Sequence, residues 1–312
     1  MKVPAYDELP VLDGLGLRYA WGVFGPDDDL GTLNHLEDTT VLAALAEART
    51  GERVGLSLEM SALDPPLYGR EAVRHTVFAA SRNIWDDRLD GFHPQAASQW
   101  DGLRHVRARE FGFWGGLTAD PPALGDRLGI EHAARRGITG RGVLLDVARH
   151  LAGTGYDPLA ETSVTAELLG EVAAAQGVTL RPGDILCVRF GWLAAYRRLD
   201  AAQRAAYAAA GTGSAFAGLD AAEATARALW DWRVAAVACD NPGAEVSPGD
   251  PAVGSLHRRL LPLLGMTVGE LFDLEELALR CAADERWTFL LVSVPLHVTG
   301  GVGSPANAVA IR

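Results

Sequence analysis

The sequence predicts an α/β fold in which a central, mostly buried sheet is flanked by helices. Apolar runs bounded by glycine or charge alternate along the chain with segments of helical period. Several of these runs are too apolar to alternate with water, so we expect a sheet covered on both faces. The 312 residues, 48% of them hydrophobic, can bury a sizeable core, and no repeat or low-complexity tract divides them. We therefore expect a single domain over residues 1–312, with residues 1–20 as an N-terminal extension or arm.

The first elements are predicted from their apolar pattern and from the residues that start and end them. Residues 40–49 have helical period, and residues 142–147 form an apolar run typical of a buried strand. Thr165 is suited to cap a helix over 165–176, Glu167 to occupy its first turn and Gly177 to end it. Pro182 and Gly183 form a turn that leads into a strand over 184–190.

The second half of the chain continues this alternation. A helix over 221–232 precedes an apolar strand over 234–239, and a helix over 255–264 ends at Gly265. A helix over 274–285 then precedes strands over 288–294 and 308–311. The stretch from residue 65 to 126 has few periodic segments but many Trp, His, Arg and Gly residues. That composition is typical of a site built from loops over a rigid sheet.

Charge and cysteine content indicate which binding partners and which cellular compartment to expect. The net charge of −12 gives no basic field for phosphates, so we expect neither a nucleic-acid nor an anionic-membrane partner. The N-terminus has prolines and acids where a secretory signal has an apolar core, and no apolar run approaches the roughly 20 residues of a membrane-spanning helix. Cys187, Cys239 and Cys281 are widely separated in apolar surroundings, which indicates reduced core residues in a cytoplasmic protein.

Asp101 and His105 are the most informative pair in the loop-rich stretch. Their spacing of four residues, among small residues and glycine, suits one metal or one proton-transfer site. A metal site gathers ligands from distant parts of a chain, and His257 and Glu270 form a second such pair across the Gly265 break. Together the four residues would make a two-His, two-acid set suited to zinc or manganese. Taken singly, each of the two later residues is explained equally well as a surface or capping residue.

Several short motifs follow one another along the chain in a fixed order. They are Trp21-Gly22, Asp-Asp-Asp-Leu-Gly-Thr-Leu-Asn-His-Leu at 27–36, Gly-Arg-Gly-Val-Leu-Leu-Asp at 140–146, Pro-Gly-Asp-Ile-Leu at 182–186, Phe-Gly-Trp at 190–192, Pro295-Leu296, and Gly-Gly-Val-Gly-Ser-Pro at 300–305. This ordered set resembles that of the longer members of the cyclase family, which includes kynurenine formamidase and isatin hydrolase relatives. The resemblance therefore runs from about residue 21 to the last residue. It implies a swivelling β/β/α fold, a homodimer or homotetramer, and a divalent metal that activates water to open an amide or lactam bond.

The family's metal-binding loop has the pattern His-x-Gly-Thr-His-x-Asp-x-Pro-x-His. Placed on this chain, its Asp falls on Asp101 and its last His on His105, while its first two His fall on Gln95 and Gln99. The family's later His and Glu ligands fall on His257 and Glu270. Because an amide is a far poorer zinc ligand than an imidazole, the resemblance implies one weakly held Zn or Mn ion instead of a dinuclear site. Gln99 would be a weak ligand or a donor to substrate, and Gln95 would face the substrate.

Four further residues are candidates for substrate binding, and each has a structural alternative. Trp100 could stack on an aromatic substrate, or it could pack in the core. Arg104 could pair with a substrate carboxylate, or it could make a structural salt bridge. Asn34 could lie near the site, or it could cap the local backbone, and His297 could line the pocket or fill a strand end.

Three functions compete at this point. The leading one is a metal-dependent hydrolase of a linear or cyclic amide (formamide, lactam or imide), with Asp101, His257 and Glu270 holding the ion and His105 as ligand or general base. The second is a lyase or cyclase that uses His105 and Asp101 as acid and base with little or no metal. The third is a non-catalytic ligand-binding protein. Eight tryptophans are compatible with an aromatic small molecule in the pocket.

Overall fold

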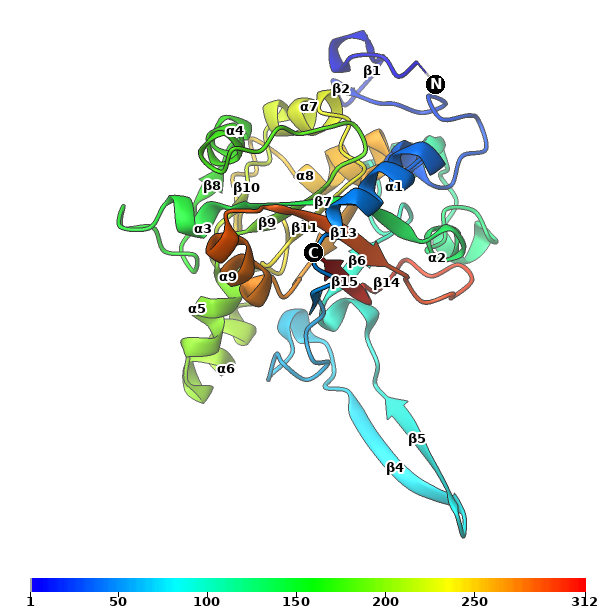
Figure 1. The fold of residues 1–312 in the computed structure, drawn as a ribbon. Helices are drawn as coiled ribbons and strands as arrows, with labels where there is room; N and C mark the ends of the chain where they lie inside the picture. Colours follow the sequence, from blue (N-terminus) through cyan, green and yellow to red (C-terminus); the bar gives the residue numbers. More distant parts are fainter. Residues whose placement is uncertain (1) are drawn as a thin grey trace.

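The computed structural model describes residues 2–312 and confirms an α/β fold built on one large central sheet flanked by helices (Figure 1). Nine strands form the sheet, in the order β14-β6-β12-β11-β9-β7-β13-β15-β3. Their bounds are β3 Arg53–Gly55, β6 Gln99–Asp101, β7 Ile138–Asp146, β9 Ile185–Arg189, β11 Ala236–Cys239, β12 Thr267–Glu270, β13 Thr288–Ser293, β14 Gly303–Pro305 and β15 Ala308–Ile311.

The centre of the sheet is parallel and its flanks are antiparallel. Strands β7, β9, β11 and β12 run parallel to one another, so their carboxyl ends meet at one edge. Strand β6 runs antiparallel between β12 and β14, and β13, β15 and β3 extend the other flank in antiparallel pairs. The carboxyl edge of the parallel strands is where α/β sheets place their sites.

Both faces of the sheet are covered, as the apolar runs predicted. Along β7, Val143 and Leu145 join one buried cluster, with residues of α4 (Ala166–Ala175), α7 (Glu223–Asp231) and α8 (Leu256–Arg258). Leu144 joins the other cluster, with residues of α9 (Glu275–Asp284) and α2 (Glu131–Arg136). Side chains that alternate between two apolar layers are the reason why these strands show no polar face in the sequence.

The predicted strands and helices are present, with small shifts at their ends. Strand β7 begins four residues before the apolar run, and α1 (Asp38–Ala44) begins two residues before the expected helix. Thr165 caps α4 by accepting from the backbone N–H of Leu168, as expected. The helix expected over 255–264 is divided: α8 gives way at Arg259 to a π-helical segment that contains Pro262. Proline cannot donate the usual helical hydrogen bond, which favours this wider turn.

The stretch expected to consist of loops contains a long hairpin. Strands β4 (Arg74–Ser81) and β5 (Ile84–Asp90) pair antiparallel and project from the body as an arm (Figure 1). The remaining elements are short or lie at the periphery of the sheet. They are β1 Val11–Leu12, β2 Leu17–Arg18, α3 Val147–His150, β8 Ser163–Val164, α5 Trp192–Arg198, α6 Ala201–Ala210 and β10 Gly218–Leu219.

The N-terminal segment packs against the body of the molecule. Tyr6 and Leu9 are buried in the cluster under α7, and Pro4 O accepts hydrogen bonds from Trp230 and Arg233. The three cysteines are buried and form no disulfide bonds. Among residues 2–312, no helix combines the length and the apolar character that crossing a membrane requires.

Candidate metal centre

Strand β6 presents Asp101 and Gln99 on the face of the sheet that α8 covers. Asp101 lies opposite Val268 of β12, and Gln99 lies opposite Glu270, the last residue of β12. Since cross-strand partners share a face, Gln99, Asp101 and Glu270 point to the same side. Trp100, between the two, points to the other side. The alternation of a three-residue strand therefore fixes which of these side chains can reach the site.

His257 reaches the same place from the start of α8. The hydroxyl of Ser255 accepts from the backbone N–H of Arg258 and so caps the helix. The carboxylate of Glu245 accepts from the hydroxyl of Ser255 at 3.0 Å and from Nδ1 of His257 at 2.8 Å. It also accepts from the backbone N–H of Leu256. Glu245 thus fixes the imidazole ring and leaves its Nε2 directed at the two strands.

Asp101, His257 and Glu270 converge on one point. Each contributes a ligand atom, and these atoms all lie within 4.8 Å of one another. Nε2 of His257 lies 3.0 Å from Oε1 of Glu270 and 3.7 Å from Oδ2 of Asp101. Both carboxylate oxygens of Asp101 are buried without a hydrogen-bond partner among residues 2–312. A buried, unpartnered carboxylate beside two other ligand groups is the arrangement that a cation would satisfy.

The pKa values of Asp101 and His257 reflect an excess of acidic groups around them. Burial raises the pKa of Asp101 well above its ordinary value, and the carboxylate of Glu270 adds to the rise. Burial alone would lower the pKa of His257, but hydrogen bonds to Glu245 and Glu270 outweigh it and raise that pKa well above the usual range. Three carboxylates therefore surround a single imidazole. A divalent cation would balance this charge, so the residues present fit zinc or manganese.

His105 lies beside this cluster. Its Nε2 is 3.7 Å from Oδ2 of Asp101, and its side chain is 31% exposed. Partial burial lowers the pKa of His105, and the neighbouring His257 lowers it further. A neutral imidazole with access to solvent is suited to accept a proton. The arrangement places His105 outside the group of three converging ligand atoms.

The two glutamines that the resemblance places on imidazoles of the family pattern lie next to the same residues. Nε2 of Gln99 donates to Oε2 of Glu270, and Oε1 of Gln99 is buried with no partner in the described part of the chain. Gln95 lies over Gly303, the residue opposite Asp101 on β14. A Cβ on Gly303 would stand 2.8 Å from Nε2 of Gln95 and 3.6 Å from Oδ1 of Asp101. Gly303 thus leaves the space that Gln95 uses to approach the site.

Two of the predicted substrate-binding residues are structural instead. Trp100 is fully buried in the opposite layer, donates to the hydroxyl of Ser293 at 2.8 Å and packs edge-on against Phe272. Arg104 is 2% exposed. Its guanidinium donates to four backbone carbonyls, those of Pro121, Gly125, Arg127 and Gly300. The core and the surrounding loops already occupy these two side chains, which favours the structural alternative that the sequence left open for each of them.

Asn34 and His297 are also placed elsewhere. Asn34 donates to Asp28 and to the carbonyl of Gly31, the local backbone role that the sequence left open. His297 is exposed in the connection between β13 and β14. Neither side chain lies in the cavity beside His257. A substrate-binding role for Asn34 and His297 therefore stays a prediction.

Three functional candidates escaped the sequence prediction. Glu245 lies in the loop that follows β11. An acid after a buried parallel strand is a sequence signal from which this candidate could have been predicted. Tyr68 and Glu245 line, with His257, a cavity of about 260 Å³. Burial raises the pKa of Tyr68, and the carboxylate of Glu270 raises it further. The guanidinium of Arg70 lies 5.2 Å from the centre of the Tyr68 ring. Its charge also opposes the rise in the pKa of Asp101.

Comparisons with known proteins agree with this geometry. The sequence model of the Cyclase family ("Putative cyclase") matches residues 54–246. A crystal structure described as a novel cyclase is 29% identical, with a TM-score of 0.83 over 94% of this chain and 99% of that chain. An isatin hydrolase bound to the product analogue thioisatinate is 16% identical, with a TM-score of 0.59 over 88% of this chain and 99% of that one.

Isatin hydrolase A from Labrenzia aggregata, bound to benzyl benzoate, is 14% identical, with a TM-score of 0.60 over 87% of this chain and 97% of that one. At these identities the two hydrolases share the fold with this chain. No curated protein matched the sequence.

Proposed function

This chain belongs to the Cyclase family, and we propose that it is a metal-dependent hydrolase that opens a linear or cyclic amide. The observation that carries the proposal is the buried carboxylate of Asp101. Its two oxygens have no hydrogen-bond partner in residues 2–312, and ligand atoms of His257 and Glu270 lie within 4.8 Å. A divalent cation at this point would satisfy both carboxylate oxygens of Asp101.

The proposed ligands are Asp101, His257 and Glu270, with the free Oε1 of Gln99 as a weak fourth. When bound, zinc or manganese would supply Lewis acidity at this point. Glu245 is the positioning residue, because its acceptance of the Nδ1 proton of His257 leaves Nε2 available. Carboxylate and imidazole ligands suit both metals, so the donor set alone does not choose between them.

His105 is the proposed general base. It is neutral near pH 7, partly exposed, and directed at Asp101, so its Nε2 can take a proton from an attacking water. The water oxygen then bonds to the amide carbon and the carbon–nitrogen bond breaks. The proton held on His105 passes to the departing nitrogen. The products are a carboxylic acid and an amine, joined in one molecule when the substrate is cyclic.

The cavity beside His257 is the proposed substrate site. Its volume of about 260 Å³ suits a small ring, and the aromatic side chains of Tyr68 and Phe216 form part of its wall. Arg70 lies over Tyr68 and is the proposed partner for the carboxylate that hydrolysis produces. We therefore assign to Arg70 the role that the sequence suggested for Arg104. Formamides, lactams and cyclic imides with one aromatic ring are the substrates to test first.

One observation favours a second candidate, an acid/base lyase or cyclase reaction with little metal. The amide of Gln99 donates to Glu270, and so occupies an oxygen that a second cation would use. In that reaction Asp101, whose pKa is raised, would be the acid and His105 the base. Both candidates need Asp101 and His105, but only the hydrolase depends on metal.

Metal analysis of the purified protein, followed by an amidase screen with added Mn or Zn, distinguishes the two candidates. The hydrolase predicts close to one equivalent of metal, activity lost in EDTA and restored by the cation, and loss of both in Asp101→Asn and His257→Ala. His150→Ala, which changes an exposed histidine of α3, is the matched control. Less than about a tenth of an equivalent, with no gain of activity on adding either metal, would overturn the proposal.

A further inference from the structure

The hydroxyl of Tyr68 is a polar group of the cavity beside His257 that the proposed reaction leaves unused. Tyr68 lines this cavity together with His257 and Glu245. The hydroxyl of another half-buried tyrosine, Tyr156, donates to the carbonyl of Phe190 at 2.9 Å and so belongs to the fold. Within residues 2–312 the hydroxyl of Tyr68 has no such partner. It is therefore free to donate to a molecule in the cavity.

The backbone of Tyr68 has a conformation that few residues with a side chain adopt. Its φ of 60° and ψ of 29° lie in the left-handed region, and Gly69 follows with a φ of 69°. Leu67 anchors the turn in the apolar cluster that also contains Leu271, and the N–H of Arg70 donates to the carbonyl of Leu67. Strained backbone of this kind is concentrated at functional sites, where the surrounding structure maintains it.

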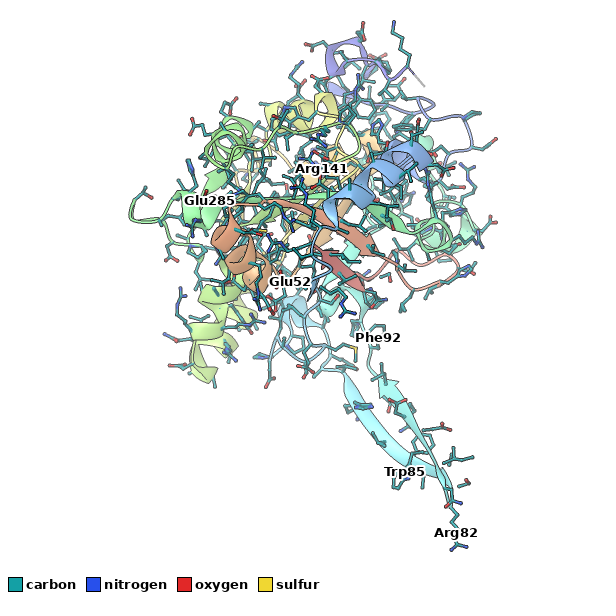
Figure 2. The ribbon with its side chains drawn as sticks, viewed as in Figure 1. Glu52, Arg82, Trp85, Phe92, Arg141 and Glu285 are labelled. Atoms are coloured by element: carbon teal, nitrogen blue, oxygen red, sulfur yellow. The ribbon has the colours of Figure 1, made fainter. Side chains whose placement is uncertain are left out.

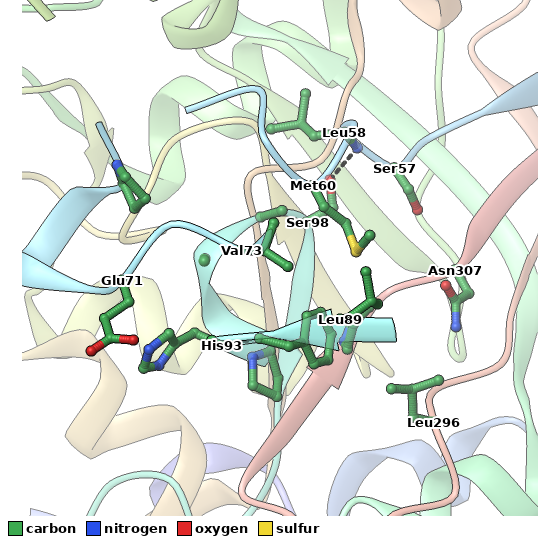
Figure 3. A pocket seen from close by; sticks show the side chains of 17 residues that line it. Ser57, Leu58, Met60, Glu71, Val73, Leu89, His93, Ser98, Leu296 and Asn307 are labelled. Carbon is green, nitrogen blue, oxygen red and sulfur yellow. Dashed lines mark hydrogen bonds between the residues drawn. The ribbon is translucent and has the colours of Figure 1, made fainter. Parts of the chain in front are cut away.

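The segment that carries Tyr68 leads into the β4–β5 arm and borders two cavities. Figure 2 shows Trp85 far out on the arm, away from the body of the molecule, so the outer arm forms no wall of the cavity beside His257. Glu71 and Val73 line a separate apolar cavity at the base of the arm (Figure 3). Tyr68, between the buried turn and these residues, lines the cavity of His257 instead. It is the side chain that this segment presents to the candidate site.

Charge effects indicate that the phenol of Tyr68 lies toward the proposed metal ligands. After burial, the carboxylate of Glu270 is the largest cause of the raised pKa of Tyr68, and Coulomb interactions weaken with distance. The charge of Arg70 opposes this rise. The same charge acts on the pKa values of Asp101 and His105. These groups therefore surround one small volume, in which a phenol, whose ordinary pKa is about 10, is a proton donor at neutral pH.

We propose that Tyr68 is a further catalytic residue, whose hydroxyl donates to the carbonyl oxygen of the amide while that oxygen carries negative charge. This role rests on the proposed hydrolysis. When the water oxygen bonds to the amide carbon, the π electron pair of the carbonyl moves onto its oxygen and His105 takes the proton of the water. When that pair returns, the carbon–nitrogen bond breaks and the nitrogen takes the proton from His105. Tyr68 keeps its own proton throughout and stabilises the charged oxygen between the two steps.

A donor in this position discriminates between the tetrahedral state and the amide itself. A hydrogen bond to a charged oxygen is roughly twice as strong as one to a neutral oxygen. Removing one such donor lowers kcat by about 100- to 1,000-fold in other hydrolases. We therefore expect Tyr68→Phe, which keeps the aromatic ring, to lower kcat about 100-fold and to change KM by less than about threefold. A hydroxyl that only binds substrate would instead raise KM with kcat unchanged.

Ligand binding tests this role without turnover. Phenylphosphonate has charged oxygens in a tetrahedral arrangement on an aromatic ring, and benzamide has a neutral, planar amide on the same ring. By calorimetry in saturating Mn or Zn, Tyr68→Phe should bind phenylphosphonate about 30-fold more weakly than the wild type, as expected for one hydrogen bond to a charged group. Its affinity for benzamide should change by less than about threefold. Tyr156→Phe removes a hydroxyl that the fold uses and should match the wild type with both ligands.

The outcomes distinguish this role from the proposed function. Circular dichroism would verify that the variants fold. Equal affinity of Tyr68→Phe and the wild type for phenylphosphonate, equal weakening for both ligands, or a wild type that binds no phenylphosphonate would overturn the role of Tyr68. Metal analysis of the same samples tests the hydrolase separately. A protein that holds no metal, but whose Tyr68→Phe variant still loses phenylphosphonate affinity, would contradict the hydrolase and support the donor.

Discussion

Replacing Asp101 by asparagine should have opposite effects on stability in the absence and in the presence of metal. Asparagine keeps the volume and removes a buried carboxylate whose oxygens lack partners and which lies among other acids. Without metal we expect the free energy of unfolding to rise by about 1–3 kcal/mol, the usual cost of an unsatisfied buried group. With metal the wild type gains about 2.7 kcal/mol at a cation concentration of 100 times its Kd, and the variant should gain little.

Urea unfolding in EDTA, and again with saturating Mn or Zn, measures both effects. Asp13→Asn changes an exposed acid and should match the wild type in both conditions. The expected result is a crossing: the variant is the more stable protein without metal and the less stable one with it. A variant that is destabilised in EDTA, or that gains as much from metal as the wild type, would refute the assignment of Asp101 as an uncompensated ligand.

Three further predictions concern residues around the site. Glu245→Gln should weaken metal binding about tenfold by calorimetry, because it loosens the ring of His257. Glu161→Gln, which changes an exposed glutamate, is its control. Equal metal affinities of Glu245→Gln and the wild type would contradict the role of Glu245. Arg104→Met should lower the free energy of unfolding by about 3 kcal/mol and leave KM unchanged, because four carbonyls lose their donor. A raised KM at unchanged stability would instead support a substrate-binding role for Arg104. Burial raises the pKa of Asp240 to about 7 although two backbone N–H groups oppose the rise. The unfolded chain releases this proton at a lower pH than the folded protein, so the contribution of Asp240 to stability should fall by up to about 4 kcal/mol as the pH rises from about 4 to 7. In urea titrations Asp240→Asn should lessen the slope by this contribution, while the contribution of Asp101 remains.

The apolar interior of the fold could be predicted from the sequence, and its edges could not. Strands β7, β9 and β11 lie between two apolar layers, and their uninterrupted hydrophobic runs show this directly. Strands β6 and β12 were missed because each is short and has polar residues toward the site. The hairpin arm was missed because its strands touch no core, so its sequence lacks the strict alternation of a half-buried strand.

The candidate site depended on topology more than on pattern. Asp101 and Glu270 are 169 residues apart, and only the pairing of β6 with β12 brings them together. Periodicity cannot reveal such a pairing, so the ligand set that residue types suggested gained its weight from the resemblance to a family. Arg104 and Trp100 were placed near the substrate because they are neighbours of Asp101 in sequence. The structure shows that sequence neighbours in a strand point in opposite directions, or turn away where the strand ends.

The geometry of β6 limits how this site can change over time. Inserting or deleting one residue just before Gln99 would turn the indole of Trp100 toward the ligands and drive the carboxylate of Asp101 into the apolar layer around Phe272. Such a change would destroy the site and the core together. Exchanges of one side chain for another on the site-facing positions carry no such cost. The amides at positions 95 and 99 are changes of this permitted kind, through which a lineage could alter its chemistry without disturbing its fold.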